Sequence, residues 1–90
     1  MKPFTPLQGR YLSFIYIYTR LHGTPPAEAD IQRFFRVTPP SVHQMVVTLH
    51  KNGLIARVPG AARSIQVLVQ PDDLPLLEFL SSGEDADSSG

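Results

Sequence analysis

Apolar residues recur at helical spacing near the start of the chain. Thr5 is a typical N-cap, Pro6 fits the first helical turn and Gly23 suits the end, so we predict a helix over 6–22. The residues that share one face of this helix are Leu7, Tyr11, Phe14, Ile15, Tyr18 and Leu21. The stripe is widened by Leu12, Tyr16 and Ile17. Two explanations remain open: this extra apolar surface packs against the C-terminal segment, or it is a self-association surface.

A short second helix is predicted over 27–35. Its inward residues are Ile31, Phe34 and Phe35, and Glu28 and Asp30 occupy the first turn, where the helix dipole favours negative charge. Residues 36–38 then form a turn.

A third helix is predicted over 39–52, because Thr38 can cap it, Pro39 fits its first turn and Gly53 can end it. The buried stripe consists of Val42, Val46 and Leu49, with Met45 at its edge. At 100° per residue the opposite face carries Pro40, Gln44, Thr48 and Lys51, flanked by Ser41, His43 and Val47.

The hydrophobic period changes after the third helix. Residues 54–58 and 64–70 are rich in Ile and Val and predict two strands, joined by a turn at 59–63. Residues 71–80 predict a short packing helix, and 81–90 an acidic, disordered tail that lacks apolar residues to bury. Residues 1–70 therefore form one domain of the winged helix-turn-helix plan, mainly α with a small β-hairpin.

Charge divides the chain into two parts, although the formal net charge is zero. Residues 1–71 hold eight basic and two acidic side chains, a net charge of +6, and residues 72–90 hold six acids and no base. The basic residues are Lys2, Arg10, Arg20, Arg33, Arg36, Lys51, Arg57 and Arg63. A basic body favours a polyanionic partner, and the major groove of DNA admits one α-helix with an exposed polar face.

The predicted DNA contacts come from the third helix and the turn of the hairpin. Gln44 can pair with adenine in a bidentate manner, while Thr48 and Lys51 suit phosphates or water. Arg63 in the turn suits a phosphate or the minor groove. The complete predicted set is Thr38, Pro40, Ser41, His43, Gln44, Thr48, Lys51 and Arg63.

Several short motifs occur in one order along residues 1–69. They are Met-Lys-x-x-Thr at 1–5, Gly-x-Pro-Pro at 23–26, Ile31, Thr-Pro-x-Ser-Val-His at 38–43, Leu-x-x-x-Gly-x-Ile at 49–55 and Pro-Gly-Ala-Ala-Arg-Ser-Ile-x-Val-Leu at 59–68. Together they make the chain resemble the N-terminal DNA-binding domain of LexA-type repressors.

The resemblance implies a sequence-specific regulator of transcription, acting as a repressor, whose recognition helix at 39–52 enters the major groove while the wing at 59–64 meets the backbone. It also implies that Pro40, Ser41, His43 and Gln44 lie where family members contact bases. Ala27 departs from the family, where a capping Thr is common. The 90 residues contain no counterpart of the protease domain, so we expect no self-cleavage from this chain alone.

Other classes of function are disfavoured. The chain has no cysteine, two acids in its basic part and no Gly-rich phosphate loop. We therefore expect neither enzymatic activity nor a cofactor. His22, His43 and His50 lack metal-ligand spacing, so no metal site is predicted. The apolar run near the N-terminus is too short to span a bilayer, so we expect no membrane partner and a cytoplasmic location.

An alternative function is a winged-helix module for protein interaction or assembly, using the apolar face of the first helix. Tyr16 and Ile17 occupy positions of that helix that would normally face solvent. They predict a homodimer or protein-partner contact, because two copies would double the phosphate contacts and read two half-sites.

Overall fold

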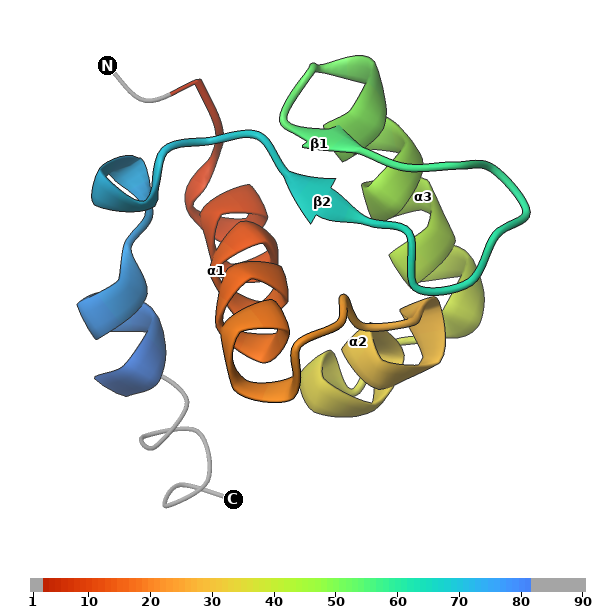
Figure 1. Ribbon diagram of the computed structural model, residues 1–90, viewed down its shortest axis with the longest axis horizontal. Coiled ribbons are helices and arrows are strands. Elements are labelled where there is room, and N and C mark those ends of the chain that lie inside the picture. The colour runs from red at the N-terminus through yellow and green to blue at the C-terminus, as the bar shows by residue number, and fades with distance from the viewer. Residues whose placement is uncertain (1–2, 82–90) are drawn as a thin grey trace.

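The fold is a three-helix unit with a small hairpin, followed by a C-terminal segment (Figure 1). In the computed structural model, residues 3–81 are described. The elements are α1 (Pro6–His22), α2 (Glu28–Phe35), α3 (Pro39–Lys51), β1 (Ile55–Ala56), β2 (Gln66–Val67) and a 3₁₀ turn η1 (Pro71–Asp73). Residues 76–81 are helical as well. The mainly α fold with a two-stranded antiparallel sheet is the one that the sequence predicts.

The ends of α1 are set by local hydrogen bonds. The Gln8 backbone N–H donates to Thr5 Oγ1 (3.1 Å), and the Thr5 N–H donates to Gln8 Oε1 (3.0 Å), which is a complete capping box. Gly23 closes the helix with φ 74°, a left-handed conformation that suits glycine. The predicted bounds of this helix are confirmed.

The buried face of α1 covers the middle of the predicted stripe and also includes Leu12. Leu12 is fully buried beside Tyr11 and Ile15, whereas Leu7 is 49% and Leu21 75% exposed. Leu7 and Leu21 lie in the first and last turns, beyond the reach of the other helices. The apolar stripe was therefore right for the middle of the helix and wrong at its ends.

Helix α2 is short and ends in an unusual residue. Ile31 is fully buried and Phe35 stacks on Tyr11 with ring centroids 4.2 Å apart, but Phe34 is 42% exposed, which corrects its predicted inward position. Arg36 ends the helix with φ 57°, a left-handed conformation that is uncommon for a residue other than glycine. This conformation turns the chain from α2 into α3.

Helix α3 matches its prediction closely. Thr38 caps it by accepting a hydrogen bond from the Ser41 N–H (3.4 Å), and the predicted stripe of Val42, Val46 and Leu49 is fully buried. The helix ends at Lys51, one residue before the predicted limit.

The hairpin is much shorter than predicted. Its ladder pairs Ile55 with Val67 and Ala56 with Gln66, in place of strands over 54–58 and 64–70. Beyond this pair the Val58 N–H donates to Ser64 Oγ (3.0 Å), so a side chain replaces the cross-strand backbone bond. The turn between the two strands is the wing, residues 59–64.

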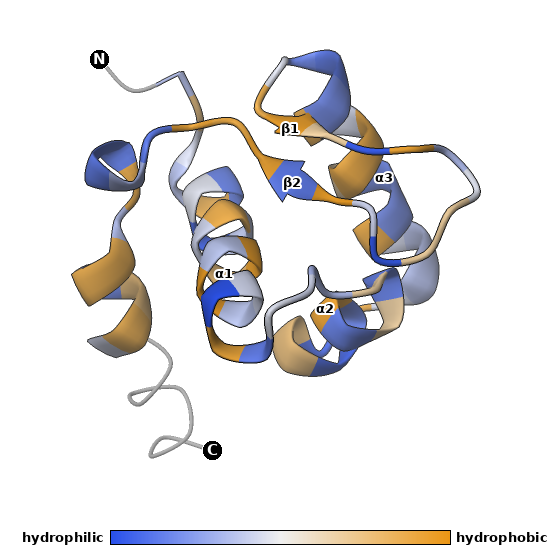
Figure 2. Cartoon of the chain, viewed as in Figure 1, coloured by the Kyte–Doolittle hydropathy of each residue, from blue (hydrophilic) through white to orange (hydrophobic). Residues whose placement is uncertain are grey.

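The C-terminal segment packs along α1 on the side away from α3 (Figure 1). Leu74 and Phe79 are buried, and the Phe79 ring lies 5.5 Å from that of Phe34. A Cβ at Gly9 would come within 3.3 Å of Pro75 Cγ, so the absence of a side chain there permits this approach. Figure 2 shows the helical turn at 76–81 coloured mainly hydrophobic, and Leu77 on it is 81% exposed.

This packing bears on the two explanations left open for α1. The C-terminal segment lies against the side of α1 that carries Gly9, whereas Tyr16 lies beside β2 and lines a hollow with Gln66 and Val67. Tyr16 and Ile17 are half-buried. The packing of this segment therefore does not explain the apolar surface at Tyr16. The acidic tail predicted for 81–90 lies outside the described residues apart from Ser81.

Candidate nucleic-acid interface

The exposed face of α3 carries most of the predicted contact residues. Because Val42, Val46 and Leu49 anchor one side of the helix in the core, the other side is turned to solvent. The predicted residues brought together by this helix and its cap are Thr38, Pro40, Ser41, His43, Gln44, Thr48 and Lys51. All of them are exposed except Thr48, which is half-buried.

The hydroxyl groups of this face are already engaged locally. Thr38 Oγ1 and Ser41 Oγ lie 2.9 Å apart at the helix start. The Thr48 hydroxyl donates to the carbonyl oxygen of Gln44 (2.9 Å). A phosphate oxygen only accepts hydrogen bonds, so Thr48 has to break this bond before it can donate to one.

His43 has a partner on a neighbouring helix. Its Nδ1 lies 3.4 Å from Oε2 of Glu28, the first residue of α2; the His43 side chain is exposed and the Glu28 side chain is half-buried. This contact orients the imidazole ring between α2 and the open face of α3, with Nε2 on the far side of the ring from Glu28.

The wing and the helix-turn-helix enclose a hollow of about 360 Å³. His43 and Arg63 both line it, so the fold brings a predicted α3 contact and the predicted wing contact to one place. Arg57 also lines the hollow, and its Nε is buried with no hydrogen-bond partner among the described residues. Arg57 had not been singled out from the sequence, because a basic residue between two short strands has no distinctive pattern.

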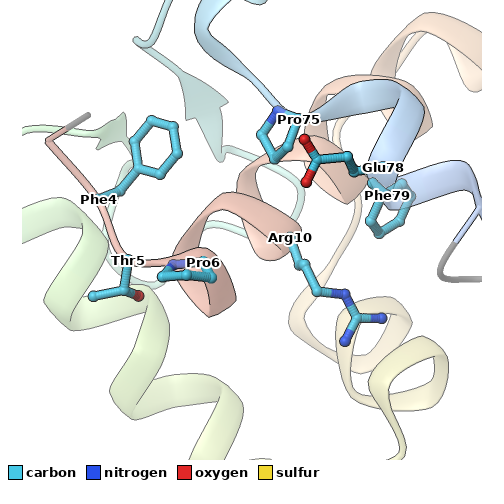
Figure 3. Close-up of a pocket in the computed structure, with 7 residues that line it drawn as sticks. All are labelled: Phe4, Thr5, Pro6, Arg10, Pro75, Glu78 and Phe79. Carbon is cyan, nitrogen blue, oxygen red and sulfur yellow. The ribbon is translucent and has the colours of Figure 1, made fainter. Parts of the chain in front are cut away.

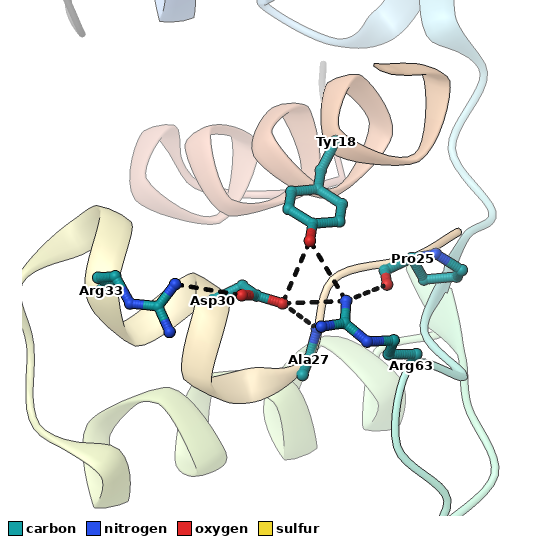
Figure 4. Close-up of polar contacts among 6 residues, drawn as sticks. All are labelled: Tyr18, Pro25, Ala27, Asp30, Arg33 and Arg63. Atoms are coloured by element: carbon teal, nitrogen blue, oxygen red, sulfur yellow. Dashed lines mark hydrogen bonds and ion pairs between the residues drawn. The ribbon is translucent and has the colours of Figure 1, made fainter. Parts of the chain in front are cut away.

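Arg63 does not extend freely from the wing tip. Its Nη1 lies 3.1 Å from Oδ2 of Asp30 and donates to the Tyr18 hydroxyl (3.2 Å) and the Pro25 carbonyl oxygen (3.3 Å), as Figure 4 shows. Arg63 also has φ 56°, so its backbone is left-handed. The structure therefore places this side chain toward α1 and α2, while the other predicted contacts face outward from α3.

Asp30 is the centre of these contacts. Its Oδ2 accepts the Ala27 N–H (2.9 Å), which is the half of a capping box that the third residue of a helix supplies, and its Oδ1 lies 3.4 Å from Arg33 Nη1. The hydrogen bond from Ala27 is the largest cause that holds the pKa of Asp30 below its usual value, followed in the same direction by Arg63 and Arg33, while burial opposes it. Only the position of Asp30, three residues after the helix cap, could have pointed to part of this role from the sequence.

A second hollow lies at the opposite end of the molecule (Figure 3). It measures about 390 Å³ between the start of α1 and the C-terminal segment, and Phe4, Arg10, Pro75 and Phe79 are among the residues that line it. None of the predicted DNA contacts belongs to it.

Within residues 3–81 no group of three or more His, Asp or Glu side chains is placed to hold a metal ion. Among the same residues, no helix combines the length and apolar character needed to cross a bilayer.

Comparison with known proteins agrees with the resemblance that the sequence motifs indicate. A family model described as "LexA DNA binding domain" matches residues 1–64. The chain is 35% identical over 86 residues to the LexA repressor of Thermosipho africanus and 34% identical over 85 residues to that of Thermosipho melanesiensis. These alignments cover 93% and 92% of this chain but 43% of each relative. The LexA repressor of Pseudothermotoga lettingae is 36% identical over 84 residues, with 91% of this chain and 42% of the relative covered. The chain thus spans less than half the length of these curated relatives.

Proposed function

The chain belongs to the LexA DNA-binding domain family, and from this premise we propose that it binds double-stranded DNA sequence-specifically as a transcriptional repressor, in the cytoplasm. In the proposed complex α3 enters the major groove and the wing lies on the DNA backbone. The family indicates a regulator rather than a catalyst.

One observation carries this proposal: α3 exposes a polar face opposite a fully buried apolar stripe. Major-groove recognition needs donors and acceptors on a rigid helix, and the burial of Val42, Val46 and Leu49 fixes the orientation of α3 in the fold. Gln44 is exposed at the middle of this face. Its side-chain amide can donate to and accept from one adenine edge.

The proposed roles divide the seven members of the contact set on α3 and its cap into two groups; Arg63 belongs to the wing. Pro40, Ser41, His43 and Gln44, in the first half of α3, would meet base edges. Thr38, Thr48 and Lys51 would meet the sugar-phosphate backbone, since they lie at the two ends of the same face. Base contacts specify sequence, while phosphate contacts set affinity and register.

Selection of binding sites from a random pool of duplexes tests the division. We expect the wild-type protein to enrich one sequence, and Gln44→Ala to lose preference at one base position by roughly 5- to 150-fold, the range of a bidentate pair. Lys51→Ala is the matched control on the same face: it weakens binding to all sequences and keeps the preference. The proposal fails if the pool yields no preferred sequence, or if Gln44→Ala selects the same sequence equally well.

We also propose a second copy of the chain as the partner of the α1 surface. Tyr16 and Ile17, the residues predicted for this contact, are half-buried. Leu21, one turn after Ile17, is 75% exposed and extends the apolar surface on the same face of the helix. Pairing of two copies through this surface would place two recognition helices in one dimer. Sedimentation should show a dimer for the wild type and a monomer for Ile17→Glu; a monomer for both at high concentration would remove this partner.

A further inference from the structure

The side chain of Arg63 joins the tip of the wing to the helices that precede α3. Arg63 Nη1 meets acceptors from three different parts of the chain: Tyr18 near the end of α1, Pro25 in the α1–α2 connection and Asp30 in α2 (Figure 4). Tyr18 lies 45 positions away in sequence. Arg63 therefore ties the turn of the wing to the two elements that precede the recognition helix.

Asp30 is the less mobile partner in its contact with Arg63. Its side chain is 14% exposed, against 44% for Arg63. It also holds the Ala27 N–H and contacts Arg33, and Tyr18 donates a longer hydrogen bond to it (3.4 Å). A carboxylate with several hydrogen-bond partners at a helix N-terminus has little conformational freedom. Contact with Asp30 therefore fixes the position of the wing, and not the reverse.

The backbone of Arg63 indicates that the tie determines the shape of the turn. A left-handed conformation is unfavourable for residues that have a Cβ, so at position 63 the contacts of the side chain offset part of its cost. Within the wing, Ser64 donates to the carbonyl oxygens of Val58 and Ala61, which closes the loop upon itself but does not attach it to α1 or α2.

We propose that Asp30 is a positioning residue for DNA binding: by holding Arg63, it fixes the wing beside the first half of α3, so that wing and recognition helix meet a duplex as one unit. This inference rests on the proposed function. Tyr18 and Pro25 complete the grip on Arg63. A wing that is already ordered loses less conformational entropy when DNA binds, and affinity rises accordingly.

A direct phosphate contact by Arg63 makes the opposite prediction. If Arg63 had to leave Asp30 to reach DNA, the carboxylate would compete with phosphate, and Asp30→Asn would strengthen binding. If Asp30 positions the wing, the same substitution weakens binding. The sign of the change therefore separates the two roles.

Fluorescence anisotropy with a labelled random-sequence duplex, across a salt series, measures that sign. We expect Asp30→Asn and Arg63→Gln each to weaken binding by roughly tenfold, the scale of ordering a few side chains, and the double variant to bind no worse than the weaker single variant. The salt slope should stay at the wild-type value. Asp72→Asn is the charge control, since Asp72 is an exposed acid in η1, outside the wing.

Three results would overturn the role of Asp30: tighter binding by Asp30→Asn, additive losses in the double variant, or a salt slope reduced by about 0.9 in Arg63→Gln, as expected for one lost phosphate contact. Asn at position 30 still has an oxygen to accept the Ala27 N–H, so the start of α2 is kept.

Amide hydrogen exchange provides a readout that does not depend on DNA. Arg63→Gln should raise exchange in residues 60–66 and leave α3 protected; unchanged exchange in the wing would contradict the tie. If the wild type bound no DNA, the proposed function and the DNA role of Asp30 would both fail, while the exchange data would still report whether Arg63 holds the wing.

Discussion

Arg36 offers a sharp test of how the turn between α2 and α3 is built. It ends α2 with φ 57°, and its backbone N–H donates to the Gln32 carbonyl oxygen (2.8 Å). The side chain is exposed. Arg36→Gly keeps the backbone hydrogen bond and removes only the Cβ that disfavours a left-handed residue, so we expect the protein to become more stable.

The magnitude follows from two opposing terms. A left-handed L-residue costs roughly 1–2 kcal/mol, and glycine loses roughly 0.5–1 kcal/mol more backbone entropy on folding. The midpoints of these two ranges give a net gain in the free energy of unfolding of about 0.75 kcal/mol. In a domain of this size that corresponds to a rise in Tm of about 3–6 °C.

Thermal and urea unfolding followed by circular dichroism would measure the change. Arg36→Ala is the control, because it removes the same charge but keeps the Cβ, and we expect no gain from it. Arg63→Gly is a second control with nearly the same φ, 56°. It relieves the same strain but loses the contacts to Asp30 and Tyr18, so we expect no comparable gain. The reasoning is refuted if Arg36→Gly lowers Tm, or if Arg36→Ala raises it equally.

Three further predictions concern stability. Ser13 is fully buried and its Oγ has no hydrogen-bond partner among residues 3–81. Ser13→Ala should therefore raise the free energy of unfolding by about 1 kcal/mol. A lower free energy of unfolding in urea melts would be inconsistent with an unsatisfied hydroxyl. Thr5→Ala removes half of the α1 capping box and should cost about 1 kcal/mol; an unchanged urea midpoint would count against the cap. The depressed pKa of Asp30 means that its carboxylate stabilises the fold above the unfolded pKa of about 3.9, and that this stability is lost as pH falls toward the folded pKa. Below about pH 4 the free energy of unfolding should therefore decrease less steeply in Asp30→Asn than in the wild type. An equally steep decrease would rule out the Asp30 carboxylate as a cause of the acid destabilisation.

The helix ends were readable from the sequence because their signals are local. Thr5, Gly23 and Thr38 act through hydrogen bonds or backbone angles that span only a few residues. The buried stripe of α3 was readable for a related reason, since one period of 3.6 residues places Val42, Val46 and Leu49 together.

The features that the sequence did not predict correctly depend on contacts between segments distant in the chain. Strand length was overestimated because the Ser64 hydroxyl takes the Val58 N–H out of the ladder. The buried face of α1 is shorter than predicted because burial depends on where α2, β2 and the C-terminal segment end, which leaves Leu7 and Leu21 uncovered.

The candidate site shows the same division. The polar face of α3 follows from periodicity, whereas the partners of Arg63 could not be inferred, because Tyr18 and Asp30 come from two other helices. The sequence pattern placed Asp30 in the first turn of a helix and gave no reason to expect it at the wing.

Binding of a labelled random-sequence duplex across a salt series tests the central claim most directly. If α3 and the wing meet DNA as proposed, the logarithm of affinity should fall linearly with the logarithm of salt concentration, by about 0.9 for each phosphate contacted. Lys51→Ala should reduce that slope by about one such contact. Absence of binding even at low salt would contradict the claim, because a phosphate-contacting surface binds any duplex under those conditions.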